Sequence, residues 1–122
     1  MVTFDEAAAM LDEIADDLPV EMYKNLNGGI YLLPQVKHHP ESRPQKPLYI
    51  LGEYINRYDM GKFIYIYYGS FMQVYPHQSP DVLRQALQRV LIHEITHHME
   101  YLAGERGLEI KDEMDMERYR RS

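Results

Sequence analysis

The chain has 122 residues, of which 45% are hydrophobic and 26% charged, as expected for a single globular domain that spans residues 1–122. Its formal net charge of −6 argues against nucleic acid as a partner, because that would require a basic stripe on the surface. There is no cysteine, so disulfides and thiolate ligands are excluded, and any metal ion must be held by His, Asp or Glu.

Neither a membrane segment nor a targeting segment is apparent. No apolar run approaches the roughly 18 residues that a membrane span needs, so we expect no membrane partner. Residues 1–18 lack the basic start and the long apolar core of a signal peptide. We therefore expect a cytoplasmic protein.

The chain begins with a predicted helix over residues 3–18. Thr3 and Glu6 have the spacing of a capping box, and apolar residues then recur at helical intervals. Pro19 ends this helix or opens a short helical turn over residues 20–26. The Asn-Gly-Gly sequence that follows stops the turn, because glycine adopts the left-handed conformation at little cost.

Three apolar or aromatic runs in the middle of the chain are predicted to be strands. They cover residues 29–33, 48–51 and 63–68. The last run is the strongest, because all six of its residues are β-branched or aromatic.

The segments around these strands are predicted to be irregular or short. Residues 35–47 contain three prolines and are expected to form a loop, and residues 56–61 a turn. After Gly69, the sequence allows either a hairpin or a short helical turn over residues 71–75. Residues near the C-terminus are highly charged and look helical.

A long helix is predicted to begin at Ser79 and to run to about Ala103. Three signals mark its start: a capping serine, Pro80 at the first helical position and Asp81 in the first turn. Gly104 is the expected C-terminal stop.

The last third of this helix contains the sequence HEITHH, which holds half of the six histidines of the chain. At about 100° per residue, His93 and His97 lie within about 40° of each other on one edge of the apolar stripe. Glu94 and His98 fall inside the apolar stripe itself. A carboxylate that faces a core is costly unless something compensates for it. Glu94 is therefore the strongest indication of a functional site.

The spacing H-E-x-x-H predicts a zinc site. Two imidazoles one helical turn apart can both reach a single Zn²⁺, and the glutamate beside the first histidine lies close to the water that the ion activates. In this interpretation His93 and His97 are ligands and Glu94 is the general base and acid. The alternative is a chance match at a polar helix end, which would usually place the glutamate on the solvated face.

The chain resembles the minimal zincin-like metallopeptidase family of bacteria, formerly a domain of unknown function. The likeness covers nearly the full chain and includes the acidic first helix ending in "LP", the segments "LYILGEY" and "FIYIYY", and a long helix with "VLIHEITHH". It implies an α+β, zincin-like fold: a small mixed β-sheet packed on an N-terminal helix and a long active-site helix. It also implies a peptide or protein substrate.

The third zinc ligand is where the sequence departs from this family. The family motif continues H-E-x-x-H-x-x-G-x-x-D, whereas Glu100 and Ala103 stand at its glycine and aspartate positions here. A longer helix puts "LEIKD" in the place of the family's final segment and makes Asp112 the third ligand. Glu109 ranks second, and Glu105 and Glu100 follow.

The remaining histidines and tyrosines have two interpretations each. His98 either orients a ligand or substrate, or is a buried histidine with satisfied hydrogen bonds. His38 and His39 either close over the site or form an exposed pair in the loop, and His77 is expected at the surface. The tyrosines of "FIYIYY" either belong to a substrate-aligning edge strand with an oxyanion-binding tyrosine, as in zinc peptidases, or pack across the sheet.

Three functions remain open at this point. The first is a peptidase with one zinc ion. The second is a metal-binding module or regulator with the same fold and no proteolytic activity, because 122 residues leave little room for substrate subsites. The third is a structural helix without a metal.

Overall fold

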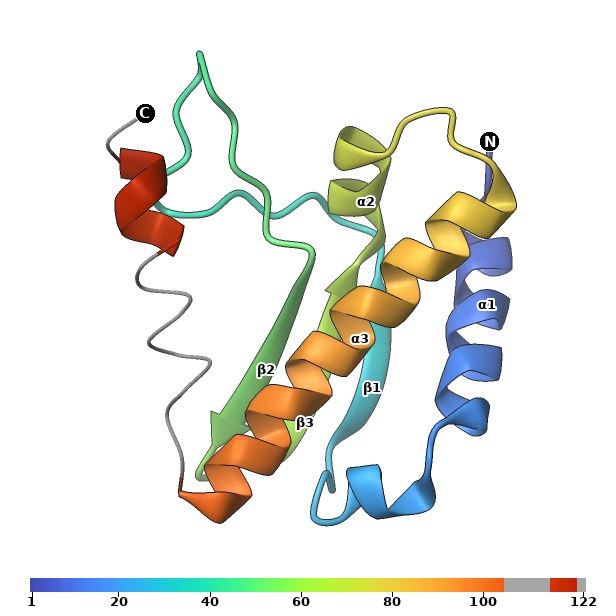
Figure 1. Ribbon diagram of the computed structural model, residues 1–122, viewed down its shortest axis with the longest axis vertical. Coiled ribbons are helices and arrows are strands. Elements are labelled where there is room, and N and C mark those ends of the chain that lie inside the picture. The colour runs from blue at the N-terminus through green and yellow to red at the C-terminus, as the bar shows by residue number, and fades with distance from the viewer. Residues whose placement is uncertain (105–114, 121–122) are drawn as a thin grey trace.

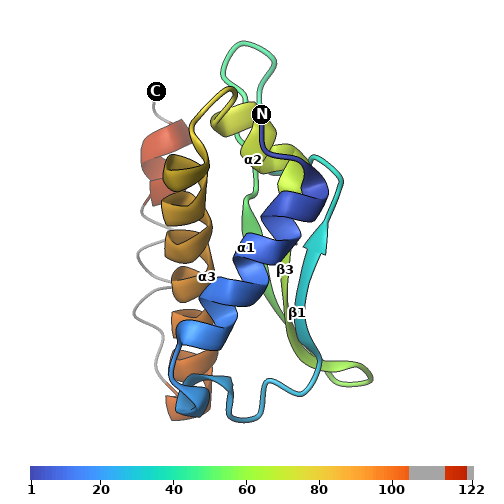
Figure 2. The ribbon, with the colours of Figure 1, turned by 90° about the vertical axis from the view of Figure 1, so that its right-hand side faces the viewer.

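The computed structural model of the chain describes residues 1–104 and 115–120. Two layers make up the fold: a three-stranded sheet, and the helices α1 and α3, which cover one of its faces (Figures 1 and 2). The predicted α+β class is therefore confirmed, as is the small mixed sheet. Among the described residues, no helix is both long enough and apolar enough to cross a membrane.

Helix α1 spans Phe4–Asp17 and has the predicted capping box. The Thr3 side chain accepts a hydrogen bond from the Glu6 N–H at 3.1 Å, and the Glu6 carboxylate accepts one from the Thr3 N–H at 3.0 Å. The helix buries Ala7, Leu11 and Ile14 in the core, as its apolar spacing predicts. After Pro19, a single 3-10 turn, η1, spans Val20–Tyr23.

The sheet is built from β1 (Gly29–Leu33), β2 (Gly52–Arg57) and β3 (Gly61–Tyr67). Strand β3 lies in the centre, parallel to β1 and antiparallel to β2. The side chains of Ile64 and Ile66 belong to the core, which places Phe63, Tyr65 and Tyr67 on the opposite face.

The prediction of a strand over residues 48–51 is wrong. In that stretch the Leu48 carbonyl accepts from the His39 N–H, and the Ile50 N–H donates to the Lys37 carbonyl. These backbone groups are therefore used within the proline-rich segment, and the first bond to β3 runs from the Tyr67 N–H to the Leu51 carbonyl. Strand β2 consequently starts at Gly52 and extends into the segment predicted as a turn.

The proline-rich segment is fixed where it leaves β1. Ser70, which is fully buried, accepts a hydrogen bond from the Lys37 N–H at 2.8 Å and donates one to the Lys37 carbonyl at 3.3 Å. Ser70 belongs to α2 (Tyr68–Val74), so of the two predicted alternatives the helical turn is present. A Cβ at Gly69 would lie 2.6 Å from the backbone of Gln35 and Val36, so this approach requires glycine.

Helix α3 spans Pro80–Ala103 and agrees with its prediction at both ends. Ser79 accepts a hydrogen bond from the Val82 N–H, and Gly104 adopts a left-handed conformation with φ of 76°. The helix crosses the sheet diagonally and packs on β2 (Figure 1). Close contact depends on Gly52, because a Cβ there would lie 2.8 Å from Cγ1 of Val90.

The described C-terminal residues 115–120 are helical and contact the proline-rich segment. The Tyr119 hydroxyl donates to the Lys46 carbonyl at 2.7 Å, and the Arg43 guanidinium lies 4.9 Å from the centre of the Tyr119 ring. Arg120 forms an ion pair with Glu41. The expectation of a charged helix near the C-terminus holds for these residues.

Two neighbouring residues of α3 provide a test of this packing. Leu91 has no exposed surface, whereas Ile92 is 37% exposed. Leu91→Ala should lower the free energy of unfolding by about 2–5 kcal/mol, because it leaves a cavity between helix and sheet. Ile92→Ala should lower it by less than about 1 kcal/mol. Urea unfolding followed by circular dichroism measures both changes, and equal losses would contradict the packing described.

Candidate functional site

A cleft of about 360 Å³ lies between β2 and the C-terminal half of α3. Strand β2 and the residues just before it contribute Ile50, Gly52, Glu53 and Tyr54, and α3 contributes Glu94, His97 and Tyr101. Two of the three residues predicted for the H-E-x-x-H site thus line one hollow.

His93 and His97 point their ring nitrogens toward each other. Their Nε2 atoms are 3.1 Å apart and their ring planes are inclined by 89°. Two nitrogens that each lie 2.0–2.1 Å from a tetrahedral zinc ion are roughly 3.3 Å apart. The observed separation therefore fits two ligands of one ion, and both side chains are half-buried beside the cleft.

Glu94 is 7% exposed and lines the same cleft as His97. Its predicted position inside the apolar stripe is confirmed, because the buried residues of α3 include Leu87, Leu91 and Ile95 as well as Glu94. A carboxylate held at the wall of a cleft, next to two converging imidazoles, is placed to exchange a proton with a water molecule there.

Among the described residues, no predicted third ligand is brought together with His93 and His97. In residues 1–104 and 115–120, no group of three or more His, Asp or Glu side chains is gathered as metal ligands. Glu100 lies half-buried on α3 and does not complete such a group. Asp112, Glu109 and Glu105 lie outside the described residues, so the assignment of Asp112 stays a prediction.

His98 is a fully buried residue with both ring nitrogens hydrogen-bonded. Its Nε2 lies 2.7 Å from the carbonyl oxygen of Lys24, and its Nδ1 lies 2.7 Å from the hydroxyl oxygen of Tyr54. The interpretation as a satisfied core histidine is confirmed. The contact with Tyr54 links it to the cleft as well.

Tyr54 is a residue of the cleft that no sequence pattern marks. It is half-buried, lines the cleft, and its ring lies 6.5 Å from that of Tyr101. Burial, with a smaller contribution from Tyr101, raises the pKa of Tyr54 to about 12, so the phenol keeps its proton at neutral pH. The strand was predicted too early in the chain, and this left Tyr54 outside any regular element.

The other histidines do not line this cleft. His38 packs against Tyr49 with ring centres 4.9 Å apart, and the Nδ1 atom of His39 accepts a hydrogen bond from the Glu41 N–H. His77 is exposed, as predicted. His38 and His39 lie in the proline-rich segment, and His77 lies in the loop before α3.

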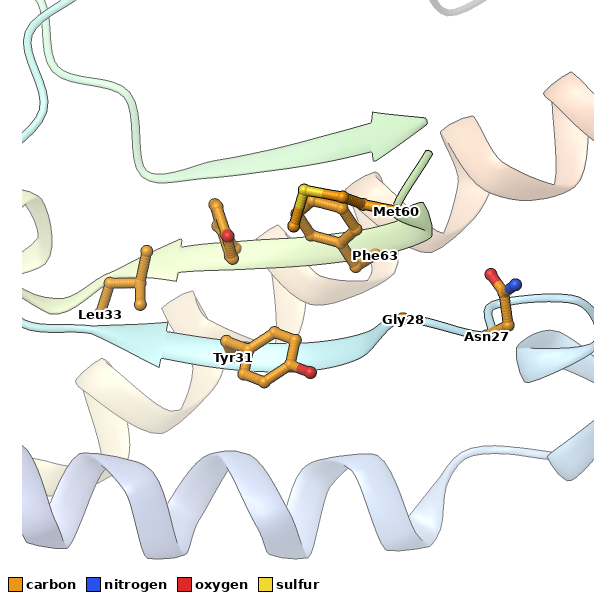
Figure 3. Close-up of a pocket in the computed structure, with 7 residues that line it drawn as sticks. Asn27, Gly28, Tyr31, Leu33, Met60 and Phe63 are labelled. Atoms are coloured by element: carbon orange, nitrogen blue, oxygen red, sulfur yellow. The ribbon is translucent and has the colours of Figure 1, made fainter. Parts of the chain in front are cut away.

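Of the two interpretations of the β3 tyrosines, packing across the sheet is the one present, because β3 is not an edge strand and the ring of Tyr65 lies 6.0 Å from that of Tyr31 on β1. Strand β3 is paired on both sides, and Tyr65 and Tyr67 lie on the sheet face away from α3. The Tyr67 hydroxyl donates to the Glu53 carboxylate, and burial together with this bond raises the pKa of Tyr67. The same face carries a second hollow of about 340 Å³ (Figure 3), lined by Asn27, Gly28, Tyr31, Leu33, Met60, Phe63 and Tyr65.

Comparison with known proteins supports the fold and adds no activity. No family model matches the chain, and no curated protein matches it. The chain is similar to the solved structure of a conserved hypothetical protein from Thermo thermophilus, with 25% sequence identity and a TM-score of 0.72. The match covers 84% of this chain and 98% of that chain.

The raised pKa of Tyr54 predicts a pH dependence of stability. Between pH 10, where an unfolded tyrosine loses its proton, and about pH 12, the folded chain binds more protons than the unfolded one. Because the unfolded chain binds fewer protons over this range, the free energy of unfolding falls as the pH rises. The contribution of Tyr54 to the free energy of unfolding is therefore fully present below pH 10 and is lost as the pH rises toward 12. Tyr54→Phe removes this contribution, so its free energy of unfolding should fall less than that of the wild type between pH 9 and pH 12.

The matched control is Tyr58→Phe, because the Tyr58 side chain is fully exposed. Its stability should decline with pH as the wild type does. Urea unfolding at several pH values provides the measurement, and parallel curves for Tyr54→Phe and the wild type would contradict the burial of this phenol.

Proposed function

We propose that this protein is a zinc-dependent metallopeptidase of zincin-like fold, similar to the minimal zincin-like metallopeptidases of bacteria. The observation that carries the proposal is the arrangement on α3. The Nε2 atoms of His93 and His97 are opposed at 3.1 Å, and the buried Glu94 carboxylate lines the same cleft as His97. This donor set suits one Zn²⁺, with Asp112 as the proposed third ligand beyond the helix.

Bound zinc would supply Lewis-acid chemistry, which polarises a peptide carbonyl and makes a water molecule more acidic. Glu94 would be the residue that takes a proton from a water molecule in the cleft as the water oxygen attacks the carbonyl carbon. It would then deliver this proton to the amine that leaves when the carbon–nitrogen bond breaks.

Strand β2 is the element best placed to align a peptide. It forms one edge of the described sheet, and its first bond to β3 involves Leu51. Because hydrogen-bonded positions alternate along an antiparallel pair, the backbone N–H and C=O groups of Gly52 and Tyr54 point away from β3. An extended peptide that pairs with this edge lies next to the cleft. Strand β2 thus takes the role that the sequence suggested for "FIYIYY".

The alternative function is a metal-binding regulator without proteolytic activity. A cleft of about 360 Å³ lies toward the lower end of the roughly 300–1,000 Å³ typical of ligand sites, which leaves limited room for substrate side chains. In that case His93 and His97 would still hold the ion, and Glu94 would have no proton to transfer.

The first prediction from this proposal concerns the metal. The purified protein should carry one zinc ion per chain, measured by elemental analysis, and His97→Ala should lose it because one of three ligands is gone. His77→Asn is the matched control, since it removes an exposed histidine at a left-handed position that asparagine tolerates. Retention of zinc in His97→Ala would contradict the site.

The second prediction separates the two functions. Glu94→Gln should retain zinc and lower the rate of peptide cleavage by at least about 100-fold, because the amide cannot act as a base. Cleavage is measured with a mixed peptide library and mass spectrometry. If zinc-loaded wild type and Glu94→Gln are equally inactive, the regulator replaces the peptidase.

A further inference from the structure

A chain of two hydrogen bonds joins three elements behind the cleft. The Lys24 carbonyl at the end of η1 lies 2.7 Å from Nε2 of His98 on α3, and Nδ1 of His98 lies 2.7 Å from the hydroxyl of Tyr54 on β2. His98 has no exposed surface, so water cannot replace either partner. Its ring also packs against the Tyr54 ring, with centres 5.2 Å apart.

The chemistry of the two ends fixes the direction of both bonds. A carbonyl oxygen only accepts hydrogen bonds, so Nε2 of His98 carries the proton. In the neutral ring Nδ1 is then an acceptor, and the Tyr54 hydroxyl must be its donor. The opposite direction would require a positively charged imidazole with no exposure to solvent, which is costly.

The single proton of the Tyr54 hydroxyl is therefore already used. To stabilise a developing oxyanion, Tyr54 would have to abandon Nδ1 and leave a buried acceptor without a partner. Tyr54 lines the cleft, and its phenolic oxygen keeps lone pairs, so the group that it can offer a bound molecule is an acceptor and not a donor. The N–H groups of a peptide backbone are the donors that match it.

We propose that Tyr54 is a substrate-binding residue that accepts a hydrogen bond from a backbone N–H of a bound peptide, and that His98 is the positioning residue that fixes the Tyr54 hydroxyl for this task. The inference rests on the proposed peptidase function. It assigns the last histidine of HEITHH to peptide binding, apart from the metal ligands His93 and His97. It also excludes Tyr54 as the oxyanion-binding tyrosine.

The direction of the hydrogen bonds can be tested without any turnover. In ¹⁵N-labelled protein, the NMR spectrum should show His98 protonated at Nε2 and unprotonated at Nδ1. The Nδ1 resonance should shift in Tyr54→Phe and stay in place in Tyr31→Phe, which removes a hydroxyl from the opposite sheet face. A proton on Nδ1 of His98 in the wild type would overturn the proposal even if peptides are cleaved.

The role of Tyr54 is tested by kinetics of the zinc-loaded protein on a peptide that it cleaves. Loss of one binding hydrogen bond in Tyr54→Phe should raise KM about threefold to tenfold and leave kcat within about twofold. Tyr31→Phe should match the wild type. A fall in kcat of about 100-fold with unchanged KM would identify Tyr54 as a transition-state donor and overturn the proposal.

The positioning role of His98 needs a pair of variants. His98→Gln keeps one donor and one acceptor, so its KM should stay nearer to the wild type than that of His98→Leu, which offers neither. If His98→Leu does not fold, the comparison of His98→Gln with Tyr54→Phe gives the answer. A KM for His98→Gln above that of Tyr54→Phe would overturn the positioning role.

A failure of the proposed function gives a different pattern. In that case the zinc-loaded wild type neither cleaves nor binds the peptide library, and the peptide-binding role of Tyr54 falls with it. The NMR spectrum would still report the Nε2-protonated His98. An inactive protein is thereby distinguished from an active one in which Tyr54 has another role.

Discussion

The constraint on which the rest of the structure depends is that one face of α3 must serve both the core and the cleft. Leu87 and Leu91 are buried against the sheet, and only a small rotation around the helix separates them from Glu94. Strand β2 lies very close to this face of the helix, because Gly52 has no side chain to hold the two apart. Where β2 passes the C-terminal half of α3, the apolar contact gives way to a cleft with polar walls.

The position of β2 is fixed from both faces of the sheet. On the helix side Tyr54 is held by the buried His98, and on the outer side Glu53 accepts hydrogen bonds from Lys37 and Tyr67. Satisfied polar contacts of this kind specify one arrangement more strictly than apolar packing does. These contacts on two consecutive residues fix the register of β2, as the proposed alignment of a peptide along its edge would require.

Much of the fold follows from local patterns, and the failures have physical causes. The capping box at Thr3 and the left-handed Gly104 act within one turn of chain, so the bounds of both long helices were predictable. The start of β2 was not, because residues 48–51 are as apolar as a strand but bond to the proline-rich segment. The H-E-x-x-H spacing predicted a candidate site on one helix, and Glu94 and His97 line one cleft. The bond between Tyr54 and His98 joins residues 44 positions apart and leaves no pattern in the sequence.

The central claim is that His93 and His97 share one zinc ion beside Glu94. Anomalous X-ray diffraction at the zinc absorption edge, on crystals of the zinc-loaded protein, tests it most directly. The account predicts one zinc ion per chain, about 2.0–2.1 Å from the Nε2 atoms of both histidines, with Asp112 as third protein ligand. Zinc held by other side chains, or no zinc between these two nitrogens, would contradict it.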